Sequence, residues 1–218
     1  MQCKPVKWFL METPEYIREL RVVGGHVALD FVNTVDGEPD GETGFENLQD
    51  YRDLVAWSAR VGVLSEDEGG RLAREARRRP EEAQVVYLDA LKLRDVLYSV
   101  FRAVADGEDP PSGSLEIMRQ YECEALSRGK LAPGDHGFQW EWKGGEDLAR
   151  MLWPLAHAAT GLLTSERLDR LKHCVGCHWL FLDASRNRSR RWCTMEVCGT
   201  HEKMRRYVAK RAARRGDA

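Results

Sequence analysis

The chain has 218 residues, of which 43% are hydrophobic and 31% charged, and its formal net charge is −2. These values are typical of a soluble globular protein with room for one domain and a small module, and they argue against a disordered chain. The sequence has no run of roughly 18 apolar residues that could span a membrane and no apolar signal-peptide segment near its start, so we expect a cytoplasmic protein with reduced thiols.

The first predicted elements are a short strand and a buried segment. The sequence RVVGGHVALDFVNTV (21–35) is apolar and β-branched, and two glycines interrupt it. It predicts a short strand that leads into a buried helix or a second strand, because periodicity does not separate the two over so short a run. The acidic, glycine-rich residues 37–44 predict a loop.

From residue 45 onward the pattern predicts helices. Ser65 and Glu68 have the form of a capping box at the start of the second helix. The third helix gives the clearest signal: it begins at Pro80, which suits a first turn, and ends at Gly107. Ser114 can cap a fourth. The first helix has apolar residues at the spacing of one buried face, namely Leu48, Tyr51, Leu54 and Val55.

A strand and a final helix complete this part of the chain. Phe138, Trp140 and Trp142 alternate with polar residues between glycines, which predicts a half-buried strand. A helix is then predicted over about 146–163, and Pro154 either kinks it or marks its start.

The charge is distributed unevenly along the chain. Residues 167–215 contain 14 Lys and Arg and four acidic residues, a net charge of +10, whereas residues 1–166 contain 19 basic and 30 acidic residues, a net charge of −11. This asymmetry favours an N-terminal domain over residues 1–166 and a basic module over residues 167–218 that meets a polyanion. The alternative is a basic tail that only aids solubility.

Four of the six cysteines lie within 25 residues, in the pattern C-x2-C, fifteen residues, C-x4-C. Two such short pairs are the usual ligands of a tetrahedral zinc ion, and four thiolates leave no position for a catalytic water. We therefore predict one structural Zn²⁺. Disulfides are disfavoured in the cytoplasm, and a thioredoxin-like site would need a βαβ context. The nearby histidines His173, His178 and His201 are interpreted as bystanders. The predicted ligands are Cys174, Cys177, Cys193 and Cys198.

The segments around these cysteines predict a treble-clef-like zinc module. HWLFLDASRNRSRRW (178–192) predicts a strand, a turn and a strand, and a basic helix follows Cys198. The aromatic residues Trp179, Phe181 and Trp192 are interpreted as a small core in preference to base-stacking platforms. The predicted fold class is α+β, mainly α: a helical N-terminal domain with a few short strands, and a C-terminal zinc module of a hairpin and a basic helix.

The basic side chains of this module suit a phosphate backbone. Apolar residues on neighbouring faces of the helix, Met204, Tyr207 and Val208, could pack on the hairpin. Phosphate contacts position a protein without reading sequence, so side chains near the helix start would have to contact bases. The candidate nucleic-acid residues are Arg186, Arg188, Arg190 and Arg191 on the hairpin and Lys203, Arg206, Lys210 and Arg214 along one helix stripe.

The stretch C..CHWLFLDASRNRSRRWC....CG, followed by a basic helix, resembles the CGNR zinc finger. That finger follows an ABATE domain in a family of proposed stress-induced transcription regulators, and ALDFVNTV, LVAWSARVGVL and KLRDVLYSVFRAVADG agree with the ABATE part. The resemblance covers essentially the whole chain. It implies that the four cysteines bind zinc and that the basic finger binds DNA.

The chain departs from the family motif at two positions. Cys198 and Gly199 are retained, but Thr200 and His201 stand where Asn and Arg are expected. Zinc binding should therefore survive. A cation near the helix start becomes a histidine, which is mostly neutral at pH 7, so DNA binding should be weaker or differently directed if that position contacts DNA.

An acidic helical domain joined to a finger suggests an effector-binding or dimerising part. His26, Asp30 and Asn33 would share a helix face and could line a pocket, although such residues more often cap helices or satisfy buried backbone groups. The sequence has no nucleophile elbow, phosphate-binding glycine loop or H-E-x-x-H motif, so an enzyme is disfavoured.

We therefore predict a cytoplasmic transcription regulator that binds double-stranded DNA through its zinc finger, with a small-molecule effector and oligomerisation left open and no membrane partner. The alternative is a zinc-scaffolded module that binds an acidic protein or RNA.

Overall fold

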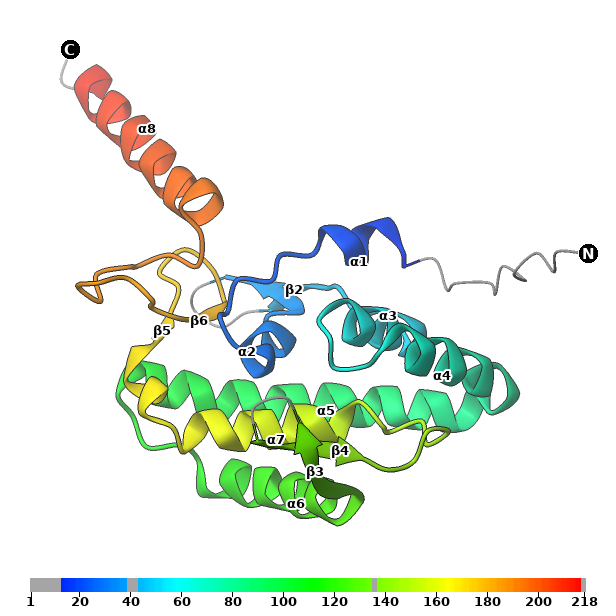
Figure 1. The fold of residues 1–218 in the computed structure, drawn as a ribbon. Helices are drawn as coiled ribbons and strands as arrows, with labels where there is room; N and C mark the ends of the chain where they lie inside the picture. Colours follow the sequence, from blue (N-terminus) through cyan, green and yellow to red (C-terminus); the bar gives the residue numbers. More distant parts are fainter. Residues whose placement is uncertain (1–12, 39–42, 135–136, 217–218) are drawn as a thin grey trace, which may run out of the picture.

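One long helix, α5 (Pro80–Asp106), runs through the helical part of this computed structural model, which describes residues 13–38, 43–134 and 137–216, except the side chains of residues 43 and 212–216. Pro80 at its start and the left-handed Gly107 (φ 78°) at its end give this helix the predicted bounds. It packs against α2 (Val27–Val32), α3 (Tyr51–Arg60), α4 (Glu66–Arg78), α6 (Ser112–Arg128) and α7 (Leu152–Leu163) (Figure 1).

The other helix starts follow local chemistry. The Ser65–Glu68 capping box is present at α4: the Glu68 N–H donates to Ser65 Oγ and the Ser65 N–H donates to Glu68 Oε2. Helix α3 begins later than predicted because the Asp50 side chain caps it. Helix α6 begins at Ser112, and the predicted cap at Ser114 is wrong: no side chain caps this helix. Helix α7 begins at Leu152, with Pro154 in its first turn, so this proline belongs to the start of the helix.

The buried segment predicted within residues 21–35 is the helix α2 and not a second strand, and the short strand predicted before it is wrong, because residues 21–26 have no regular secondary structure. After α1 (Glu15–Glu19), His26 caps α2, because its Nδ1 accepts the Ala28 N–H at 3.3 Å. Two short antiparallel strands follow, β1 (Val35–Gly37) and β2 (Thr43–Glu46). Within the loop predicted at 37–44, residues 39–42 lie outside the described part of the chain.

The predicted strand at Trp140 is confirmed as β4 (Gly137–Trp142), and its partner is β3 (Gly129–Gly134), for which no strand was predicted. Trp140 and Trp142 are half-buried and stack at 5.8 Å between ring centroids. The prediction that Phe138 lies on the buried face is wrong: this residue is 77% exposed, and it lies at the turn end of the hairpin, where it pairs with Pro133.

The cysteine-rich part begins with a 3-10 turn, η1 (Glu166–Arg170), and an antiparallel hairpin of β5 (Leu171–His173) and β6 (Leu180–Leu182). The predicted second strand before Cys193 is absent: residues 183–194 form an irregular loop. A π-helical turn, η2 (Met195–Gly199), leads into α8 (Thr200–Gly216), which extends away from the rest of the molecule (Figure 1).

The hairpin of the finger shares the hydrophobic core of the helices. Leu171, Leu180 and Leu182 are buried and belong to the same apolar cluster as Leu29, Leu97 and many other residues of α2, α3, α5 and α7. The finger is therefore held against the helical part by apolar packing, and the division at 166/167 stays a prediction from charge. Within the described ranges, no helix is long and apolar enough to cross a membrane.

Candidate metal centre and nucleic-acid interface

The four predicted ligands come together in space. The ligand atoms of Cys174, Cys177, Cys193 and Cys198 all lie within 4.8 Å of one another, and the sulfur of Cys193 is 3.6 Å from those of both Cys177 and Cys198. A tetrahedral zinc ion with Zn–S bonds of about 2.3 Å would separate its sulfurs by about 3.8 Å. The spacing of the thiols therefore fits one structural Zn²⁺.

The surrounding backbone supports the same conclusion. The Gly176 N–H and the Cys193 N–H both point at the sulfur of Cys174, at 3.4 and 3.3 Å. Gly176 lets the first knuckle approach the second pair, since a Cβ there would lie 3.1 Å from the Cβ of Cys198. Burial and the neighbouring Cys174 sulfur raise the pKa of the Cys198 thiol. Four thiolates in so small a volume need a cation, and a closed Cys₄ set is typical of structural zinc.

Two aromatic residues form the small core beside the thiols. Trp179 and Phe181 are fully buried with Cys174, Cys193 and Cys198, and Trp192 packs on them while partly exposed. The indole N–H of Trp179 donates to the Val35 carbonyl at 2.9 Å. Trp179 and Phe181 are thus used for packing.

The three nearby histidines lie outside the thiol cluster. His178 is buried and stacks on Tyr98 of α5 with ring centroids 3.8 Å apart, and its burial lowers its pKa to about 4. His173 lies beside Arg102 of α5, 3.1 Å from its guanidinium. His201 is exposed in the first turn of α8.

A buried carboxylate that the sequence did not identify organises the loop between the cysteine pairs. Asp183 is fully buried and accepts hydrogen bonds from Lys172 Nζ (2.7 Å), the Ser185 N–H (2.9 Å) and the Arg190 N–H (3.0 Å). Although burial opposes ionisation, these hydrogen bonds hold the pKa of Asp183 well below its usual range. These side-chain contacts hold the loop in place of the backbone hydrogen bonds that a second strand would have formed. The only sequence signal was an acidic residue in a basic segment.

The predicted arginines of the loop have different surroundings. Arg186 and Arg191 are exposed, and Arg188 is exposed but pairs with Asp169 at 2.7 Å. Arg190 turns inward: its guanidinium donates to the carbonyls of Trp192 and Cys193 and covers the Phe181 ring at 4.4 Å. Arg190 therefore stabilises the loop.

Helix α8 presents its predicted cations to solvent. Lys203, Arg206 and Lys210 are exposed, and Arg206 pairs with Glu202 at 2.7 Å. Arg214 lies outside the residues whose side chains the structure describes. The prediction that the apolar side chains of this helix pack on the hairpin is wrong: Met204, Tyr207 and Val208 are 56%, 55% and 60% exposed, because α8 extends away from the hairpin.

The three polar residues predicted to line a pocket bind backbone groups. Asn33 Nδ2 donates to the Leu180 carbonyl at 2.8 Å, and Asn33 Oδ1 accepts the Leu180 N–H at 2.9 Å. Asp30 accepts the Gly24 N–H at 2.8 Å, and His26 caps α2. In this arrangement Asn33 joins the helical part to strand β6 of the finger, while Asp30 holds the segment that precedes α2.

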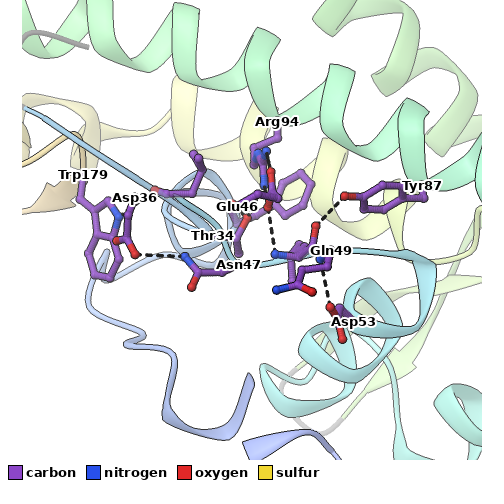
Figure 2. Close-up of polar contacts among 12 residues, drawn as sticks. Thr34, Asp36, Glu46, Asn47, Gln49, Asp53, Tyr87, Arg94 and Trp179 are labelled. Carbon is purple, nitrogen blue, oxygen red and sulfur yellow. Dashed lines mark hydrogen bonds and ion pairs between the residues drawn. The ribbon is translucent and has the colours of Figure 1, made fainter. Parts of the chain in front are cut away.

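A second polar cluster is centred on Arg94 of α5, whose side chain lies beside Glu46 and Thr34 (Figure 2). The guanidinium donates to both carboxylate oxygens of Glu46 and, at 3.0 Å, to Thr34 Oγ1. Glu46 in turn accepts the Leu48 N–H at 2.9 Å. Arg94 is only 4% exposed. No local sequence pattern indicates this pair, because its two residues are 48 positions apart.

Comparison with known proteins agrees with this geometry. Residues 25–166 match the ABATE family model, described as "putative stress-induced transcription regulator", and residues 170–211 match the CGNR zinc finger. No curated protein matches the chain. Neither family is described as an enzyme. The chain therefore belongs to the ABATE family and carries a C-terminal CGNR zinc finger.

Proposed function

We propose that this protein is a DNA-binding transcription regulator of the cytoplasm, in which zinc held by the four cysteines shapes the finger and the finger's cations contact the phosphates of duplex DNA. Residues 1–166 are the regulatory domain and residues 167–218 the DNA-binding module. Support comes from family membership and from one structural observation. Arg186, Arg188 and Arg191 of the loop are exposed, and so are the described Lys and Arg side chains of α8.

The acidic groups of the finger do not cancel this charge. Asp183 is buried in the loop, Asp169 pairs with Arg188, and Glu202 pairs with Arg205 and Arg206. The fourth acidic residue of 167–215, Glu196, is exposed. Exposed cations at Arg186, Arg191, Lys203 and Lys210 remain, and residues 167–215 of the module carry a net charge of +10. Such a surface favours a polyanion, and association with it should depend on salt.

The test is fluorescence anisotropy with zinc-replete protein and a labelled random duplex, across a salt series and with a chelated control. If about four to six phosphates are contacted, log K against log salt should have a slope of about −4 to −5. Chelation should abolish binding, because the finger needs its metal to fold. A finger that binds no duplex at low salt would contradict the proposal.

An acidic protein partner is the main alternative, and it would give binding to acidic proteins without binding to duplex DNA. RNA is less well supported. Single-stranded RNA is usually held by stacking its bases on exposed aromatic rings. In the finger, Trp179 and Phe181 are buried, Trp192 is partly buried and Tyr207 of α8 is exposed.

A further inference from the structure

A cavity of about 430 Å³ lies where the regulatory domain meets the first zinc knuckle. Its walls come from β1 and β2, from α5 and from the finger: Val35, Glu46, Arg94, Asp95, Tyr98 and His178 are among the residues that line it. This volume falls within the range of small-molecule sites, about 300–1,000 Å³. The cavity is distinct from His26, Asp30 and Asn33, whose side chains bind backbone.

Two buried polar atoms of the lining have no hydrogen-bond partner among the described residues. They are Nδ1 of His178, a residue that is 2% exposed, and Nε of Arg94, a residue that is 4% exposed. Buried polar atoms in folded proteins are normally satisfied, so unpartnered atoms in the wall of a cavity are available to a bound ligand or to water. A ligand nitrogen that carries a hydrogen could donate to His178 Nδ1, whereas Arg94 Nε is a donor and needs an acceptor such as a ligand oxygen.

The charges around the cavity favour a ligand with a positive charge. Arg94 is neutralised by its two hydrogen bonds to Glu46. Asp95 is exposed at the edge of the cavity and has no hydrogen bond or ion pair within the described part of the chain, so one carboxylate remains uncompensated. A second anion would be repelled, whereas an ammonium group would be attracted. Val32, Val35 and the Tyr98 ring supply apolar walls for the body of the ligand.

We propose that this cavity is the effector site of the protein and that its ligand is a small organic amine with an apolar body. The ammonium group pairs with Asp95, and the body packs between β1 and α5. The regulatory part of this inference rests on the proposed function, but amine binding itself does not.

The position of the cavity explains how a bound ligand would affect the conformation of the finger. His178 follows Cys177 directly in sequence, and its ring stacks on Tyr98. The backbone N–H of His178 donates to the Gly37 carbonyl at 2.9 Å. Tyr98 also accepts a hydrogen bond from Arg102, whose guanidinium lies beside His173. A ligand against Tyr98 and His178 would therefore stabilise one arrangement of the knuckle relative to the helices, which is the differential contact that allosteric coupling requires.

Isothermal titration calorimetry tests the site with three probes that share the same apolar body and differ in their polar group. We would titrate 3-phenylpropylamine, 3-phenylpropanol and 3-phenylpropanoate into the zinc-replete full-length protein. The amine should bind at least about tenfold more tightly than the carboxylate, and Asp95→Asn should remove about this factor, because an ion pair at a partly screened site contributes on the order of 1 kcal/mol. Glu81→Gln, which removes an exposed carboxylate at the other end of α5, should change nothing.

Equal affinities for amine and carboxylate, no heat for any probe up to about 10 mM, or an unaltered amine affinity in Asp95→Asn would each overturn the inference. DNA anisotropy with and without saturating amine is measured separately. Amine binding without DNA binding in either state would refute the proposed function and leave the site intact. DNA binding without amine binding would refute the site alone.

Discussion

Asn33 joins the helical part of the chain to the finger with a single side chain. Its amide satisfies both backbone groups of Leu180, and the residue is 1% exposed. Polar side chains in apolar segments commonly serve the backbone in this way. The arrangement explains why an asparagine lies at the end of a buried helix, where its polarity could also have suggested a ligand.

Replacing Asn33 with Ala should destabilise the protein by about 2–4 kcal/mol, because two buried backbone groups of Leu180 would lose their partners. Urea unfolding at saturating zinc measures the change. Asn47→Ala is the matched control, since the Asn47 amide makes one bond to Asp36 at 3.2 Å in a half-exposed position. If both variants lost the same free energy of unfolding, the hydrogen bonds between Asn33 and Leu180 would contribute no more to stability than an ordinary half-exposed hydrogen bond.

His201 offers a second test at the residue scale. It is exposed in the first turn of α8, where the family motif has an arginine, and Thr200 beside it donates to the Met195 carbonyl at 3.1 Å. If this turn contacts a phosphate, His201→Arg should tighten DNA binding and make the slope of log K against log salt more negative by about 0.9.

His201→Gln, which adds a polar side chain without a permanent charge, is the control for this substitution. Anisotropy across the salt series compares both variants with the parent protein. An arginine that binds DNA no better than the glutamine would place this turn away from the nucleic acid.

At the scale of elements, α8 extends away from the rest of the molecule (Figure 1). Its described residues are exposed except Glu202, which is half-buried, and it packs mainly on η2. A surface helix without an apolar contact gains little stability from packing, so its cations are available for a partner.

Removing two of these cations should weaken DNA binding uniformly across sequences. In Lys203→Gln/Lys210→Gln the slope of log K against log salt should become less negative by about 2, since each lost phosphate contact changes it by about 0.9. Lys92→Gln/Lys143→Gln removes the same charge from exposed positions of the regulatory domain and serves as the control. Similar losses in the two double variants would indicate a nonspecific effect of net charge.

Local sequence chemistry predicted the elements whose ends are locally determined. The Ser65 capping box, Pro80 and Gly107 fix α4 and α5 through contacts a few residues apart. Strand β3 was missed because its residues lack alternation and depend on pairing with β4. The predicted strand before Cys193 is absent because the buried side chain of Asp183 sets the geometry of this loop, and no local pattern reveals that burial.

The same distinction applies to the candidate sites. The four thiols were identifiable because ligand spacing is local within each pair. Asn33 with Leu180, Arg94 with Glu46 and Tyr98 with His178 join residues that are tens of positions apart, so the contacts between the finger and the helices required the structure.

For the whole molecule, the shared core makes the finger and the helices energetically dependent. Leu171, Leu180 and Leu182 are buried among residues of the helical part, and His173 and His178 contact α5. These leucines and histidines therefore complete the core of the helical part, although they belong to the finger, whose fold depends on zinc. Burial of each leucine contributes about 1.5–3 kcal/mol.

Zinc removal should consequently destabilise the helices as well as the finger. Chelation should accelerate amide hydrogen exchange in α5 around residues 93–101, and it should lower the melting temperature followed by far-UV circular dichroism by about 10 °C, given a loss on the order of 5 kcal/mol. Cys174→Ser without chelator should reproduce both effects, which excludes an action of the chelator itself. If α5 kept its protection while the finger peptides lost theirs, the two parts would be thermodynamically independent. Zinc binding would then have only a small effect on the stability of the regulatory domain, because the leucines of β5 and β6 would contribute little to the stability of α5.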